Sequence, residues 1–95
     1  MEEKKDYQKL LEAQLAQWEI EIEKLNAQAQ KAKVEVRLEY QKQIDELKKK
    51  QAAARNKLTE LKGSAGEAWQ EIKIGAEHAL DELKKAFSSA KSKFK

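Results

Sequence analysis

The feature that most constrains the fold is the absence of glycine and proline from residues 2–62. Proline interrupts a helix because it lacks an N–H and its ring clashes with the preceding turn, and glycine weakens a helix by roughly 1 kcal/mol relative to alanine. The chain has no proline, and its three glycines all follow residue 62. Since neither residue interrupts this range, we expect one long helix over about residues 3–62.

A cluster of helix-breaking residues follows directly, at residues 63–66. Gly63 suits the left-handed position that commonly ends a helix. Ser64 followed three residues later by Glu67 has the spacing of a capping box, which starts a helix. We therefore expect a hinge at Gly63, Ser64 and Gly66. The alternative is a single helix that continues through both glycines.

Composition places the chain in the all-α class. With 39% charged and 40% apolar residues, it has the composition of long amphipathic helices. Its 95 residues allow one domain at most. We divide it into a long heptad and hendecad helix over 1–62, a Gly/Ser hinge over 63–66 and an amphipathic hendecad helix over 67–95. The expected architecture is a helical hairpin or coiled coil.

The spacing of apolar residues indicates how these helices pack. From Leu11 to Val36 they recur in alternating steps of four and three, which is a heptad pattern. Two successive steps of four then join Val36, Tyr40 and Ile44, and such a stutter shifts the pattern toward an 11-residue period. Beyond it, apolar columns spaced by eleven residues favour a hendecad helix. The residues expected at helix–helix interfaces are Leu11, Leu15, Trp18, Ile22, Leu25, Val36, Tyr40, Ile44, Leu47, Leu58, Leu61, Trp69, Ile72, Leu80, Leu83 and Phe87.

A lone helix does not bury such an apolar stripe, so another surface must cover it. The second helix, about residues 65–93, is half as long as the first and covers only half of it. We therefore expect the N-terminal heptads, Leu11 to Val36, to pair with another chain. The expected partner is a second copy, which gives a homo-oligomer, or another helical protein.

Residues typical of enzymes and metal sites form no recognisable pattern. The chain has no cysteine, and His78, its only histidine, has only Glu77 and Glu82 beside it, whereas structural zinc sites use four ligands. Paired carboxylates such as Glu19 and Glu23 share a helix face, but general acid–base catalysis needs carboxylates held in a desolvated cleft. We therefore expect no enzymatic activity, no cofactor and no metal.

The C-terminal third permits a second interpretation. After Glu82 the chain has five lysines and no acidic residue, and the apolar face of this helix carries Trp69 and Phe87. A basic amphipathic helix with aromatic residues is typical of membrane-surface binding. Nucleic acid is not an expected partner, because lysines without base-reading side chains bind it only non-specifically. The residues expected to contact lipid or anions are Trp69, Lys84, Lys85, Phe87, Lys91, Lys93, Phe94 and Lys95.

Three segments carry a resemblance to a known family: EYQKQI at 39–44, GEAW at 66–69 and ALDELKKAF at 79–87. Over about residues 7–94 the chain resembles small, largely uncharacterised coiled-coil stress-response proteins of cyanobacteria and proteobacteria. It departs from them at Leu80, where the family pattern leads us to expect a second tryptophan. The resemblance implies a non-enzymatic cytoplasmic protein linked to stress, with no catalytic residues.

These observations favour a non-enzymatic coiled-coil protein that acts by helix–helix self-association. Two alternatives stay open. One is a peripheral membrane or lipid-binding protein that uses residues 65–94. The other is a chaperone-like or desiccation-protective protein, since the 11-residue columns are similar to those of apolipoprotein-like and desiccation-protection helices. The expected location is cytoplasmic, or peripheral to a membrane for the first alternative.

Overall fold

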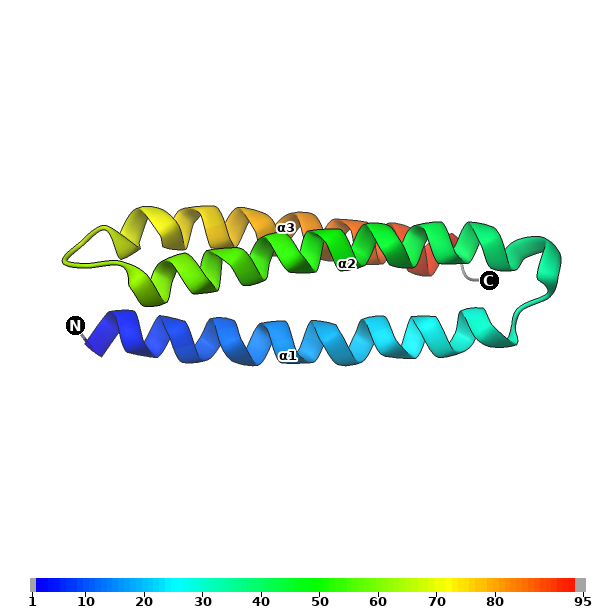
Figure 1. Cartoon of the computed structure of the whole chain (residues 1–95), viewed down its shortest axis with the longest axis horizontal. Coiled ribbons are helices and arrows are strands. Elements are labelled where there is room, and N and C mark those ends of the chain that lie inside the picture. Colours follow the sequence, from blue (N-terminus) through cyan, green and yellow to red (C-terminus); the bar gives the residue numbers. More distant parts are fainter. Residues whose placement is uncertain (1, 94–95) are drawn as a thin grey trace.

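The structure is a computed structural model that describes residues 2–93, and it contains three antiparallel helices (Figure 1). These are α1 (Glu2–Lys31), α2 (Val34–Gly63) and α3 (Trp69–Lys93). They lie side by side in a bundle of 52 × 18 × 17 Å, with the two connections at opposite ends. No strand occurs within the described range. The predicted all-α class with helices packed in hairpins is confirmed.

The prediction of one continuous helix over residues 1–62 is wrong, because the chain reverses at Ala32 and Lys33. Lys33 has an extended backbone, with φ −62° and ψ 149°. The Arg37 guanidinium donates to the carbonyl oxygens of Gln30 at 3.3 Å and Ala32 at 3.1 Å. Carbonyls at a helix end have no partner inside the helix, so the arginine satisfies two of them. This two-residue connection therefore forms without glycine or proline.

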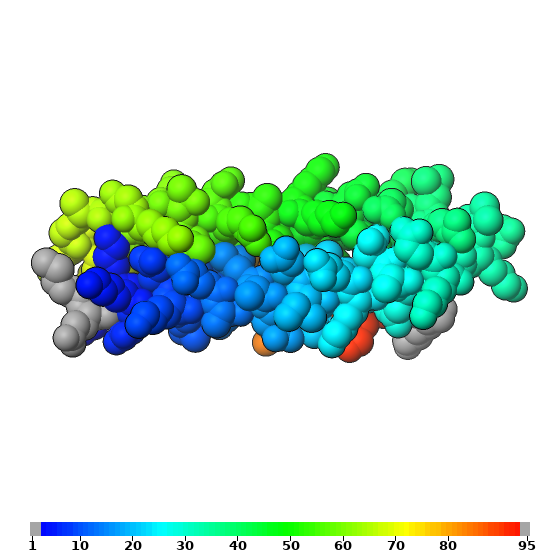
Figure 2. Space-filling model, turned by 60° about the horizontal axis from the view of Figure 1, so that its bottom comes forward, coloured from blue at the N-terminus to red at the C-terminus, as the bar shows by residue number. Residues whose placement is uncertain are grey.

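The reversal folds α1 back along the whole of α2. Polar contacts accompany the apolar packing of this pair: Gln51, itself buried, donates to the Leu15 carbonyl oxygen at 3.2 Å, and Arg55 pairs with Glu19 at 3.3 Å. Figure 2 shows the two helices in contact along their length. The prediction that the N-terminal heptads lie uncovered is therefore wrong, because an additional break supplies the helix that covers them.

The predicted break at the Gly/Ser segment is present, but its details differ. α2 extends to Gly63, and the Ser64 hydroxyl donates to the Leu61 carbonyl oxygen at 2.7 Å. The hydroxyl therefore closes the end of α2, so the capping box predicted from Ser64 and Glu67 is wrong. The left-handed residue is Gly66, with φ 60°, and not Gly63. We call residues 64–68 the Gly/Ser loop.

The buried positions follow heptad spacing in every helix. In α3 the buried residues Trp69, Ala76, Leu83 and Ala90 recur every seven residues. The predicted hendecad period is wrong because its 11-residue columns extend across the connections, where the apolar pattern changes phase. Val36 illustrates the error, since it belongs to an 11-residue column but is 41% exposed.

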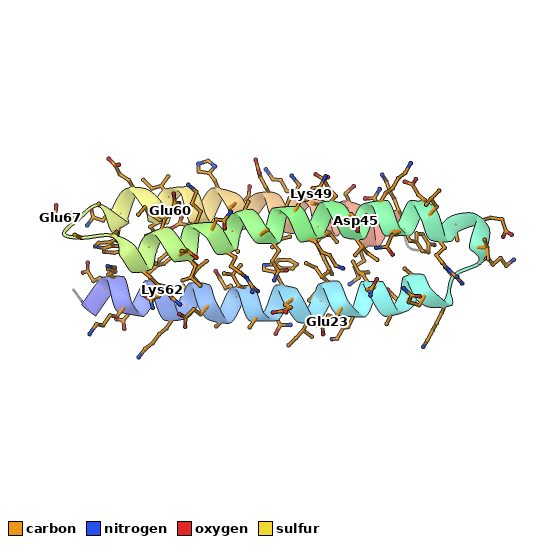
Figure 3. All side chains as sticks on the ribbon, in the orientation of Figure 1. Glu23, Asp45, Lys49, Glu60, Lys62 and Glu67 are labelled. Atoms are coloured by element: carbon orange, nitrogen blue, oxygen red, sulfur yellow. The ribbon has the colours of Figure 1, made fainter. Side chains whose placement is uncertain are left out.

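The interior consists of two apolar clusters, one at each end of the bundle. Charged side chains, such as Glu23, Lys49 and Glu60, project outward from the ribbon (Figure 3). The connection-end core comprises Ile22, Leu25, Ala29, Ile44, Leu47, Leu83 and Ala90. The loop-end core comprises Leu11, Leu15, Ala54, Leu61, Trp69 and Ala76. Each cluster draws on all three helices, so the bundle is a single packed unit.

Candidate interaction groove between α1 and α3

A shallow groove of about 510 Å³ runs between α1 and α3. These two helices each pack more closely against α2 than against each other. Leu10, on the α1 side, is 52% exposed, although neighbouring Leu11 is fully buried. The residues that line the groove are Tyr7, Leu10, Gln14 and Trp18 of α1 with Glu77, Leu80, Asp81 and Lys84 of α3.

Aromatic packing closes one end of this groove. The rings of Trp18 and Phe87 meet edge to face, with centroids 5.1 Å apart, and both side chains are half-buried. Such a pair contributes about 0.5–1.5 kcal/mol beyond its buried area. The rings pack against the connection-end core and join α1 to α3 where their backbones are not in close contact. Their size therefore helps to keep the groove open on the adjoining turns.

Tyr7 gives the groove an unsatisfied polar atom. Its hydroxyl is buried and finds no hydrogen-bond partner within residues 2–93, while Lys73 Nζ lies 5.2 Å from the centre of its ring. Burial, and next the negative charge of Glu77, raise the pKa of the Tyr7 hydroxyl above its ordinary value of 10.0. A buried polar group without a partner costs stability.

The α3 side of the groove carries charges of both signs. Glu77, Asp81 and Lys84 are exposed, and Asp81 also pairs with Lys85 at 3.1 Å. Exposed ion pairs add little to stability, but charges around an apolar patch select the orientation of a partner. The groove thus combines half-buried apolar side chains with a mixed-charge border, as helix–helix contact surfaces do.

Most of the residues predicted at helix–helix interfaces do lie between helices, but between helices of the same chain. The buried ones are Leu11, Leu15, Ile22, Leu25, Ile44, Leu47, Leu61, Trp69 and Leu83. The half-buried ones are Trp18, Tyr40, Leu58, Ile72, Leu80 and Phe87. Val36 is the exception, because it sits just beyond the reversal, where no helix covers it. Of the set, only Trp18 and Leu80 line the groove.

The residues predicted to contact lipid do not form one exposed face. Trp69 is buried in the loop-end core, and Phe87 packs against Trp18. Phe94 and Lys95 lie outside the described residues. The lysines at 84, 85, 91 and 93 are exposed. The basic half of this surface is therefore accessible, whereas its apolar half is covered by α1 and α2.

Sequence reasoning missed Tyr7, Leu10 and Gln14 as surface candidates. The available signal was the adjacent pair Leu10 and Leu11, because two neighbouring apolar residues widen the stripe beyond one heptad seam. A wide stripe is typical of a helix that meets two neighbours. The predicted hinge residues, Gly63, Ser64 and Gly66, lie at the loop end of the bundle, where residues 64–67 contribute to a separate hollow with Trp69.

Within residues 2–93, no group of three or more His, Cys, Asp or Glu side chains is placed to hold a metal ion. None of the three helices is long and apolar enough to cross a membrane.

Comparisons of the chain with protein-family models, curated proteins and solved structures find no match. The resemblance to coiled-coil stress-response proteins therefore stays a prediction.

Proposed function

We propose that this protein is a non-enzymatic helical-bundle protein that acts by self-association, and that two copies meet through the groove between α1 and α3. The observation that supports this most directly is the exposed Leu10 beside half-buried Tyr7, Trp18 and Leu80. Burying such a surface releases about 25 cal/mol per Å² of apolar area. Helix–helix contact also suits the elongated shape, since the groove runs parallel to both helices.

The charges favour a second copy of the chain over an unrelated helix. In a dimer with two-fold symmetry, each copy presents the same patch to the other. When two α3 helices lie antiparallel about an axis near Leu80, Glu77 of one copy faces Lys84 of the other. Glu77 and Lys84 are therefore complementary across the two-fold axis, and Lys85 offsets the charge of Asp81, which lies next to the axis.

The test compares two lysine substitutions at apolar positions of similar exposure. Leu10 is 52% exposed inside the groove, and Ile20 is 47% exposed on α1 outside it. Sedimentation equilibrium over micromolar concentrations should show a dimer for the wild type and for Ile20→Lys, but a monomer for Leu10→Lys. A wild type that stays monomeric, or a dimer of intact bundles that tolerates Leu10→Lys, would contradict the proposal.

We also propose a second function, membrane-surface binding, for which the exposed lysines of α3 are the specific support. Because Trp69 and Leu83 are buried, contact with lipid acyl chains requires the bundle to open. Anionic vesicles should then shift tryptophan emission to the blue, whereas neutral vesicles should not. An unchanged spectrum with both vesicles would exclude it. The chaperone-like or desiccation-protective role and the link to stress stay predictions.

A further inference from the structure

The connection between α1 and α2 consists of two residues, Ala32 and Lys33. Lys33 already has a helical φ of −62°, and only its ψ of 149° lies far from the helical value of about −42°. The Ala32 N–H still bonds to the Ala29 carbonyl at 3.1 Å, as a tight last helical turn does. Rotation about one main-chain bond of Lys33 therefore returns this residue to helical geometry.

The same connection leaves backbone groups poorly satisfied. Lys33 occupies the N-cap of α2 but makes no side-chain capping bond, and the end of α1 relies on the exposed Arg37 guanidinium. The first four N–H groups and the last four carbonyls of a helix lack partners inside it. If α1 and α2 were continuous, the free carbonyls of α1 and the free N–H groups of α2 would bond to one another.

The apolar stripe also continues through the connection. The buried positions of α1 end at Ala29, and those of α2 begin at Ile44 with half-buried Tyr40 before it. In a continuous helix, Ala32 and Val36 join the two halves in steps of three and four. The additional step of four from Val36 to Tyr40 is a stutter, which helices accommodate by a local change of supercoil. Val36, exposed in the bundle, would then lie on the central seam.

From these three observations we propose that α1 and α2 fuse into one helix and that two copies of the chain exchange their α1 helices in an elongated dimer. Each α1 then packs against α2 and α3 of the other copy through the same core contacts that it makes in the bundle. The only new interface lies where the two long helices cross, and there the two Val36 side chains meet. Exchange of this kind needs no new binding site, because the bundle interior supplies it.

The exchanged dimer has a distinct shape. A helix over residues 2–63 rises about 1.5 Å per residue and is about 93 Å long. The bundle measures 52 Å along its longest axis. A dimer formed through the α1–α3 groove leaves each bundle intact, so the two forms of self-association differ in their internal distances as well as in the residues they need.

The experiment uses the full chain, refolded from denaturant at low and at high protein concentration. The products are separated by size, and their mass and maximum dimension are measured by light scattering and small-angle X-ray scattering. High concentration should yield a dimer at least about 90 Å long, which does not form at low concentration. The absence of any species about 90 Å long at every concentration, whether the chain is then monomeric or forms only dimers of intact bundles through the groove, would overturn the proposal.

One substitution identifies the connection as the cause. Lys33→Pro fits the φ of the bundle and no hydrogen bond of the Lys33 N–H is lost, but proline breaks a continuous helix. It should abolish the long dimer and leave the monomer folded. A long dimer that persists in Lys33→Pro would overturn the proposal.

A matched pair of lysine substitutions keeps the test decisive if the proline variant folds poorly. Val36→Lys places two like charges where the fused helices cross, whereas Leu38→Lys changes a residue that is 70% exposed and lies on the opposite face of α2. Val36→Lys should lower the yield of long dimer about tenfold or more, and Leu38→Lys should not. Equal yields from the two variants would overturn the proposal. Leu10→Lys should leave the long dimer intact, which separates this exchange from the groove dimer.

Discussion

The two ends of the bundle reverse the chain by different physical means. At one end, the Gly/Ser loop uses five residues, a left-handed Gly66 and a serine hydroxyl that closes α2. At the other, Ala32 and Lys33 reverse the chain with no left-handed residue, and the side chain of Arg37, in the first turn of α2, supplies the cap. The first reversal is encoded locally, whereas the second depends on the burial that it makes possible.

This difference explains why a helix-compatible segment bends. Residues 31–36 contain no strong helix breaker, so the free-energy cost of interrupting the helix must be offset elsewhere. Folding α1 back buries Leu11, Leu15 and Ile22 against the other helices. Full burial of such side chains contributes about 1.5–3 kcal/mol each, so the three together exceed the loss of a few helical hydrogen bonds at about 1 kcal/mol each.

The largest predicted effect tests whether the two ends fold as one unit. Leu47 belongs to the connection-end core and Leu61 to the loop-end core. Both residues lie in α2 and are fully buried. Each substitution by alanine should lower the free energy of unfolding by about 2–5 kcal/mol, because it removes buried methyl groups and leaves a cavity. Urea titration followed by circular dichroism measures the loss.

The shape of these unfolding curves shows whether the two ends of the bundle unfold together. Since α2 spans both cores, each variant should still unfold in one transition with the wild-type dependence on urea. A second transition in only one variant would mean that the two ends unfold separately. In that case the difference between the connections would extend to the cores that adjoin them.

The next effect concerns the loop that glycine chemistry builds. Gly66 has φ 60°, so Gly66→Ala should cost about 1–2 kcal/mol although no atom lies within 4 Å of the new methyl group. Gly63 ends α2 with ordinary helical geometry and equally open surroundings, so Gly63→Ala should stabilise by up to about 1 kcal/mol. Thermal unfolding of the pair measures both. The same sign for both variants would contradict this account of the loop.

The fold was predictable wherever local chemistry decides it. The Gly/Ser break could be located because glycine tolerates conformations that other residues avoid. The break at Ala32 and Lys33 could not be located by looking for glycine or proline. Its trace in the sequence is the change of phase at Val36, Tyr40 and Ile44, which is equally compatible with a stutter in a continuous helix.

The groove was less predictable than the fold. Trp18 and Leu80 were identified as interface residues, but the interface expected for Trp18 was with another chain. Whether an apolar helix face meets its own chain or another depends on how many helices the chain forms. One undetected reversal changed that number, and the surface left for a partner moved from the heptad seam to the residues around Leu10.

A smaller effect tests the side-chain cap of the two-residue connection. Arg37→Ala removes the guanidinium that donates to Gln30 and Ala32, and should cost about 1 kcal/mol. Arg55→Ala is the matched control, because Arg55 only forms an exposed ion pair with Glu19 and its loss should cost at most about 0.5 kcal/mol. Chemical denaturation resolves this difference. Equal losses would show that the cap does not stabilise the reversal.

The smallest effect belongs to the loop end and depends on pH. The folded state raises the pKa of Tyr7 above 10.0, so the unfolded chain loses this proton first as the pH rises. This ionisation therefore leaves the folding stability unchanged well below pH 10 and lowers it progressively above pH 10. Tyr7→Phe removes both this titration and the unsatisfied hydroxyl, and should be as stable as the wild type or up to about 1 kcal/mol more stable at neutral pH. The difference in melting temperature should widen in favour of the variant above pH 10, while lysine titration affects both proteins alike.

In a Tyr40→Phe background Tyr7 is the only tyrosine, so ultraviolet absorbance follows its ionisation directly. A midpoint at or below 10 would show that water reaches the hydroxyl, and that the groove between α1 and α3 is open at the loop end.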